Sequence, residues 1–170
     1  MASNRKLGKR TDQRVQLVYS QASSLLWHGE IVTTLERAKE VRKVAEKMIT
    51  TAIRTYEDTV NVDKLKTNLK NEKIKVAFVN DGPRKLAARR RLLAIVQNIP
   101  EERAKKEKKA EYKARTKDIK FPLIEKIFRE YAPKYDARAK EKNCGGGYTR
   151  IIKLGERRGD DASMVILQLV

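Results

Sequence analysis

Residues 33–52, TTLERAKEVRKVAEKMITTA, carry the clearest amphipathic pattern in the chain. The opening TTLE fits a capping box, with Thr33 as the cap and Glu36 reaching back to it. This stretch predicts a helix with one buried face, because its apolar and small residues recur at helical spacing. They are Ala38, Val41, Ala45, Met48, Ile49 and Ala52. The charges of the opposite face need no role beyond keeping the helix soluble, and they are Arg37, Lys39, Arg42 and Lys43.

A second helix is predicted upstream of this one. Thr11 suits its N-terminal cap and Gly29 its C-terminal stop. Residues 1–11 are basic and lack a period, so we expect them to form an arm, and residues 30–33 form a short strand. The helix is indicated by the spacing of Val15, Val18, Ala22, Leu25 and Leu26.

The middle of the chain alternates between strand and helix patterns. Apolar and polar residues alternate within residues 56–83, which predicts a long hairpin, with a short helix around Leu65 and Leu69 as the weaker alternative. Pro83 suits the first position of a new helix. Residues 101–120 hold 14 charged positions, so they form a loop or an exposed helix. A last helix is predicted between Pro122 and Pro133.

The C-terminal part has a different pattern. Residues 148–154 and 163–170 read as strands joined by a glycine-containing turn, and both are apolar enough to lie centrally against helices. We therefore predict one α+β domain over residues 1–170. Its helices form a layer on a small sheet, which consists of the strand at 30–33 and the C-terminal hairpin.

Composition narrows the function. The chain has 40 Lys and Arg against 22 Asp and Glu, a net charge of +18. Such an excess is best explained by a polyanionic partner, nucleic acid before an anionic membrane surface. We expect no membrane span and no secretory signal. A single Cys and a single His leave little material for catalysis, a metal site or a cofactor, so we expect none of these.

Two basic segments are candidate RNA contacts. The first is the arm with the start of the next helix, and the alternative for it is a solubilising tail or a short targeting peptide. The second is the helix after Pro83, where the alternative is a basic face packed on acidic neighbours. The candidates are Arg5, Lys6, Lys9, Arg10 and Arg14 in the first segment, and Arg84, Arg89 and Arg90, with Lys85 and Arg91, in the second.

The C-terminal hairpin supplies the remaining candidates. Tyr148 follows three glycines and could stack on an unpaired base, with a half-buried structural tyrosine as the alternative. Arg150 could pair with a phosphate, and Arg157 and Arg158 lie together in the turn. The glycine run is not a nucleotide-binding loop, because no helix with Gly-Lys-Ser/Thr follows it.

Four separated motifs make the chain resemble the bacterial large-subunit ribosomal protein seventeen family. They are Arg5-Lys6-Leu7-Gly8, Ile31 to Leu35 with Arg37 to Glu40, Gly146 to Ile151, and Arg158-Gly159-Asp160 with Met164. The resemblance implies a non-enzymatic α+β protein of the cytoplasmic ribosome. It would bind large-subunit ribosomal RNA near the nascent-peptide exit, beside other ribosomal proteins. The chain departs from the family at residues 56–83 and 100–120, which look like insertions, and at Ser20-Gln21, where the family often has Arg-Asn.

Two other classes of function fit less well. A free-standing DNA- or RNA-binding regulator would need a helix-turn-helix or an aromatic platform on a sheet, and neither is clear in the sequence. An RNA-processing enzyme would need clustered acids or a pair of histidines. The sequence therefore favours an architectural RNA-binding protein.

Overall fold

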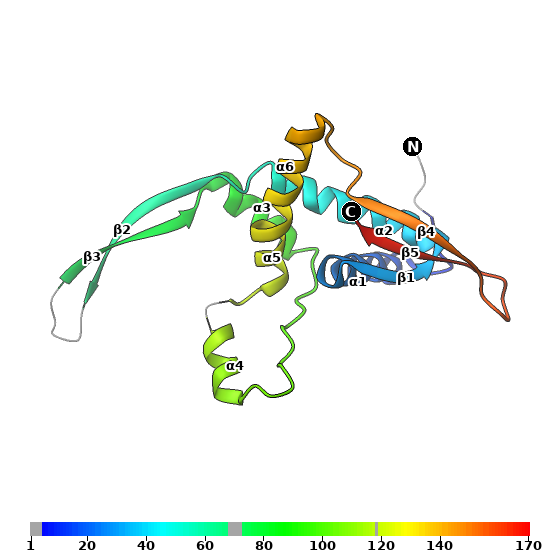
Figure 1. Cartoon of the computed structure of the whole chain (residues 1–170), viewed down its shortest axis with the longest axis horizontal. Helices are drawn as coiled ribbons and strands as arrows, with labels where there is room; N and C mark the ends of the chain where they lie inside the picture. Colours follow the sequence, from blue (N-terminus) through cyan, green and yellow to red (C-terminus); the bar gives the residue numbers. More distant parts are fainter. Residues whose placement is uncertain (1–4, 68–72, 118) are drawn as a thin grey trace.

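Two helices and a small sheet form the body of the molecule. A computed structural model describes residues 5–67, 73–117 and 119–170. In it α1 (Thr11–His28) and α2 (Leu35–Ile53) lie side by side against the three-stranded sheet (Figure 1). The architecture is α+β, as the sequence predicts.

The sheet is antiparallel, with the order β1-β5-β4. β1 (Glu30–Thr34) and β4 (Thr149–Glu156) flank β5 (Ser163–Leu169), whose Val165 and Leu167 are buried. The predicted strands are thus confirmed, but their expected central position is right only for β5. β4 is an edge strand with a register shift between Lys153 and Gly155, and Leu154 beside this shift is 55% exposed.

The starts of both body helices differ from the prediction. Arg10, and not Thr11, occupies the N-cap position of α1. α2 begins at Leu35 after Thr34, and the capping box of Thr33 and Glu36 does not form. The reason is that β1 runs on through Thr34, so the backbone there is committed to pairing with β5. The end of α1 is as expected, since Gly29 adopts a φ of 86° and its N–H bonds to the Leu25 carbonyl.

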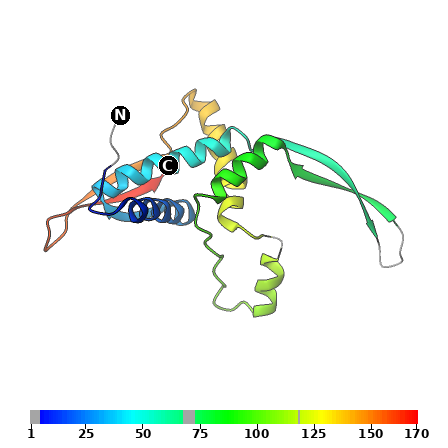
Figure 2. The same cartoon turned by 180° about the vertical axis from the view of Figure 1, so that it is seen from behind.

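A long hairpin projects from the body on the side away from the sheet (Figures 1 and 2). It consists of β2 (Thr59–Thr67) and β3 (Lys73–Asp81), which confirms the predicted hairpin. The helical alternative is wrong at Leu65, which lies in β2, while Leu69 lies outside the described residues.

The root of this hairpin is joined to the next helix. α3 (Pro83–Leu93) starts at the predicted proline, and the Asp58 carboxylate accepts hydrogen bonds from the backbone N–H groups of Arg84 and Lys85, at 2.8 and 3.2 Å. A Cβ on Gly82 would collide with that carboxylate, so a larger residue here would force the Asp58 side chain to move away from α3.

The charged segment after α3 forms a second projection. It contains α4 (Lys109–Thr116), which has no buried residue, as an exposed helix should. The Tyr112 hydroxyl donates to the Glu101 carbonyl at 2.9 Å, and Arg115 pairs with Glu101 and Glu107. The segment is therefore held together largely by contacts within itself.

The predicted stop at Pro133 is wrong. α5 (Pro122–Lys126) continues through a π-helical turn, η1 (Ile127–Tyr131), into α6 (Ala132–Lys142). Pro133 lies in the first turn of α6. A proline lacks an N–H and crowds the carbonyl four residues earlier, and the wider π-turn before it accommodates both effects.

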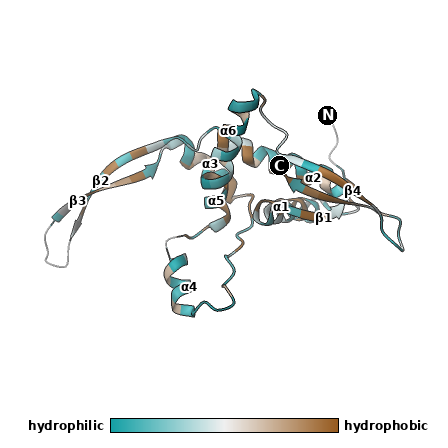
Figure 3. Ribbon diagram, viewed as in Figure 1, coloured by the Kyte–Doolittle hydropathy of each residue, from teal (hydrophilic) through white to brown (hydrophobic). Residues whose placement is uncertain are grey.

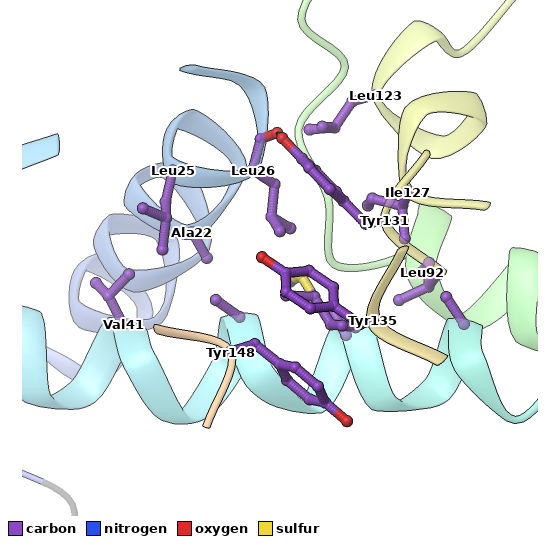
Figure 4. Packing of buried hydrophobic residues seen from close by; sticks show 14 of the residues in the cluster. Ala22, Leu25, Leu26, Val41, Leu92, Leu123, Ile127, Tyr131, Tyr135 and Tyr148 are labelled. Atoms are coloured by element: carbon purple, nitrogen blue, oxygen red, sulfur yellow. The ribbon is translucent and has the colours of Figure 1, made fainter. Parts of the chain in front are cut away.

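The core lies where α1, α2, the α5–η1–α6 segment and β5 meet. Figure 3 shows hydrophobic stretches along these helices and the sheet, and the buried residues among them form one cluster. At the centre Tyr135 packs on Tyr148 with ring centroids 4.9 Å apart (Figure 4). The Tyr131 hydroxyl donates to the Leu26 carbonyl at 2.7 Å and so ties η1 to α1.

Candidate nucleic-acid interface

The described part of the arm folds back on the body. Arg5 pairs with Glu36 and Glu40 of α2, and Leu7 packs against the core. A turn at Leu7 and Gly8, both with positive φ, lets the Lys9 N–H bond to the Lys6 carbonyl at 3.2 Å. Residues 5–10 of the predicted arm therefore form a turn that packs on the body.

The cations of the arm differ in how accessible they are to an anion outside the protein. Lys6 and Lys9 are exposed. Arg10 is also exposed but binds Asp12 through two hydrogen bonds, of 2.8 and 2.6 Å. Arg14 is half-buried and, with Arg5, lines a hollow between α1 and α2. Lys6 and Lys9 are thus the cations of the described arm best placed for an outside anion.

Arg89 is committed within the protein. Its guanidinium binds Asp81 at 2.6 Å and also Glu125, and it lies 5.2 Å from the ring centroid of Phe128. Burial alone would lower the pKa of Arg89, but the hydrogen bonds to the two carboxylates outweigh it, and the pKa is raised. Arg89 is therefore not available to contact a phosphate. For this residue the alternative reading of the helix is correct, since Arg89 packs on acidic neighbours.

The other arginines of α3 point outward. Arg84, Arg90 and Arg91 are exposed. Arg84 and Arg91 line one hollow, together with Arg54 of α2. Arg84 and Arg91, seven residues apart, therefore lie on one face of the helix.

The predicted stacking of Tyr148 on an unpaired base is wrong, because its ring is not accessible. Only 6% of the residue is exposed, because the ring packs on Tyr135 inside the core (Figure 4). The glycines before it are held by Arg138, which donates to the carbonyls of Gly146 and Gly147 at 3.1 and 2.9 Å. This segment is a structural support for β4.

The arginines of the C-terminal hairpin remain on the surface. Arg150 is exposed and bonds to Gln168 at 3.3 Å. Arg157 binds Asp160, and the bond from Arg157 lowers the pKa of Asp160 to about 2. Arg158 is exposed and, within the described part of the chain, has no carboxylate partner. Arg150 and Arg158 are the most available cations here.

A longer basic surface was missed by the sequence analysis. α2 and α3 form the walls of a continuous groove, with α1 contributing Tyr19 at one end. Its two parts, of about 580 and 350 Å³, share Thr51 and Arg91. We call this the α2–α3 groove, and its cations are Lys43, Lys47, Arg54, Arg84 and Arg91.

The groove lacks negative charge along its described lining. By contrast, the hollow beside α5 is lined by four glutamates, Glu101, Glu102, Glu125 and Glu130. The sequence did contain a signal for the groove, the spacing of Lys39, Lys43 and Lys47 by one helical turn. It was hidden because Glu40 and Glu46 interrupt the run and because only the fold brings α3 alongside.

The described residues provide neither a metal-binding cluster nor a membrane-spanning helix. No cluster of three or more His, Cys, Asp or Glu is arranged to hold a metal ion there. None of the helices described is both long enough and apolar enough to cross a membrane.

Comparison with known proteins gives a consistent result. The profile of the family described as ribosomal protein L17 matches residues 17–170. Three similar proteins are each named large ribosomal subunit protein bL17. The one from Lachnospira eligens is 38% identical over 192 residues, that from Acetivibrio thermocellus 36% over 180, and that from Clostridium botulinum 37% over 170. Each match covers the whole of both chains.

Proposed function

Because this chain belongs to the ribosomal protein L17 family, it is a structural component of the large ribosomal subunit and not an enzyme, and we propose that it binds ribosomal RNA and stabilises its fold near the nascent-peptide exit. Its place is the ribosome of the bacterial cytoplasm, with other large-subunit proteins as neighbours. Within one domain of residues 1–170, segments 56–83 and 100–120 are insertions added to the RNA-binding body.

One observation carries the RNA-binding proposal. The net charge is +18, and well-exposed cations lie on separate elements around the body instead of being neutralised by acids. Cations without a carboxylate partner in the described chain include Lys6, Lys9, Arg84, Arg90, Arg150 and Arg158. Lys and Arg that neutralise phosphates release counterions from RNA, and this release is a strong source of affinity.

RNA binding is tested through its dependence on salt. If the protein neutralises Z phosphates, log K falls against log salt with a slope of about −0.9Z on duplex and about −0.7Z on single strands. We expect a steep slope for the full chain on ribosomal RNA fragments. A flat response would contradict the proposal, because affinity would then not come from the charge.

A truncated chain that starts at Thr11 tests the arm. It should fold, since α1 begins at that residue, and should show a shallower slope because Lys6 and Lys9 are gone. We expect its melting temperature to be slightly lower than that of the full chain, because Arg5 and Leu7 contact the body. An unchanged slope would remove the arm from the interface.

The location is tested by directed cleavage. Cys144 is the only cysteine and is exposed, so an iron chelate attached to it generates hydroxyl radicals at one known place. After assembly into large subunits, cleavage of RNA segments that line the exit region is the expected result. Cleavage confined to distant segments would refute the location but leave RNA binding intact. A Cys144→Ser chain is the control.

A further inference from the structure

We propose that the α2–α3 groove holds a single strand of RNA, with phosphates on its basic rim and bases on its apolar floor. The proposal rests on the proposed function and goes beyond it, since it assigns one site and one form of RNA. The groove combines two properties, a rim of cations and a floor of hydrophobic side chains, without an acidic residue among its described lining.

The rim offers charge that the protein does not use itself. Among the described residues, Lys47, Arg54, Arg84 and Arg91 have no carboxylate within ion-pair distance, and all four are exposed. Lys43 is shared, since it also binds Glu40 at 3.1 Å. From Lys43 to Arg54 the rim extends about 16 Å along α2, at 1.5 Å per residue. A row of this length contacts several successive phosphates of one strand.

The floor favours unpaired bases. Met48 and Leu92 are each 2% exposed and belong to the core, and the half-buried Val44 and Ile95 lie beside them. Tyr19 adds an aromatic ring at the end near α1. Bases in a duplex face each other and leave such a floor uncovered, whereas unstacked bases can lie on apolar and aromatic side chains.

The repeating chemistry of RNA favours it over a protein ligand for this groove. An acidic peptide would match the rim, but it would have to supply both the acids and an apolar face at the spacing of the groove. A single RNA strand carries a phosphate at every nucleotide and a flat base beside it, so any sequence meets both requirements. The acidic peptide is kept as the competing outcome of the experiment.

The experiment uses the full chain and a dodecamer of uridylate, with a duplex of equal length for comparison. The groove variant combines Lys47→Gln, Arg54→Gln, Arg84→Gln and Arg91→Gln. The matched control removes the same charge from the exposed segment before and within α4, through Arg103→Gln, Lys105→Gln, Lys106→Gln and Lys113→Gln. Melting followed by circular dichroism establishes that both variants are folded.

The expected result is a change of slope specific to the groove. Four lost contacts at about 0.7 each should reduce the slope of log K against log salt by about 3 on the single strand. The control should change it by less than 1, and only the groove variant should lose the preference for single strand over duplex. Equal changes in both variants would overturn the site, because the charge would then act without location. If the wild-type chain binds neither RNA, the proposed function itself fails.

Two further measurements keep the outcome clear. A dodecamer containing 4-thiouridine, irradiated with the wild-type chain, should cross-link to peptides within residues 43–54 and 84–95. Cross-links confined to other segments would overturn the proposal without any variant. Polyglutamate of equal charge should compete at least tenfold more weakly than the oligonucleotide, and equal competition would favour an acidic peptide instead.

Discussion

The hydroxyl group of Tyr56 lies 2.8 Å from a carboxylate oxygen of Asp136, 80 residues further along the chain. This bond connects the end of α2 to α6, and a second carboxylate oxygen, from Glu57, lies 2.9 Å from the same hydroxyl. The hydrogen bond to Asp136 raises the pKa of Tyr56. The Tyr56 side chain therefore links the segment after α2 to α6, close to the root of the long hairpin.

Replacing this phenol should weaken the body. For Tyr56→Phe we expect the free energy of unfolding to fall by about 1.5–3 kcal/mol, the usual range for a hydrogen bond to a charged group. Urea unfolding followed by circular dichroism measures it. Tyr112→Phe is the control, because its hydroxyl binds only the Glu101 carbonyl within the α4 segment. Equal losses in the two variants would refute a special role for Tyr56.

Alkaline pH should destabilise the protein through its buried tyrosines. Burial raises the pKa of Tyr131 to about 12 and also raises that of Tyr135. An unfolded tyrosine titrates near 10, so between about pH 10 and 12 the unfolded state loses protons that the folded state keeps. Stability is complete below pH 10 and falls as the pH rises through this window.

The measurement for this effect is urea unfolding at a series of pH values from 8 to 11.5. Tyr131→Phe should be less stable at pH 8, because it loses the bond to Leu26, yet its stability should depend less steeply on pH. An identical pH dependence in the two chains would show that the alkaline loss comes from other groups, such as the lysines.

Arg89 should matter for folding and not for RNA. Arg89→Met keeps an unbranched aliphatic side chain but removes the guanidinium that lies over Phe128, and it leaves Asp81 and Glu125 without one of their partners. We therefore expect the free energy of unfolding to fall by about 1.5–3 kcal/mol. The salt dependence of RNA binding should stay within that of the wild-type chain. Arg84→Met, on the same helix but exposed, should show the reverse pattern. A stable Arg89→Met chain with weakened RNA binding would restore Arg89 as a contact.

The α4 segment should be removable. Its bonds are mostly internal, and a notable contact at its base is the 3.4 Å bond from the Asn98 side chain to the Lys120 carbonyl. Joining Ile99 to Phe121 through a short Gly/Ser linker should change melting little, since loop length alters closure entropy slowly, by about 1 kcal/mol here. Melting and occupancy of the large subunit are measured together. A folded chain that no longer enters subunits would identify the segment as a contact within the ribosome.

Local patterns predicted the elements well, and their ends less well. The hairpin of residues 59–81 followed from alternation, and the start of α3 followed from Pro83. The predicted capping box does not form because Thr34 pairs with Met164 of β5, a partner 130 residues away. This pairing keeps residues 33 and 34 in the strand, so the helix begins only at Leu35. The helix end predicted at Pro133 was wrong because a π-turn allows a helix to continue through a proline. Such a turn has no clear signature in the sequence.

The candidate interface was harder to predict, because exposure depends on the whole fold. Tyr148 and Arg89 have the residue types that contact RNA, but one packs on Tyr135 and the other binds two carboxylates. Conversely, Lys47 lies one helical turn after Lys43, on a helix whose named charges needed no role beyond solubility. Its position in a groove depends on α3, which the chain reaches only after the hairpin.

The join between the hairpin and α3 gives the molecule a lever. Asp58, the residue before β2, binds the first turn of α3, and Asp81 at the end of β3 binds Lys85 and Arg89, so both sides of the hairpin's root are held to the same helix. Strands of nine residues reach about 30 Å from that root. A small tilt of α3 is thereby amplified into a large sweep of the far end, and a load on the far end is delivered as torque to the helix that carries Arg84 and Arg91.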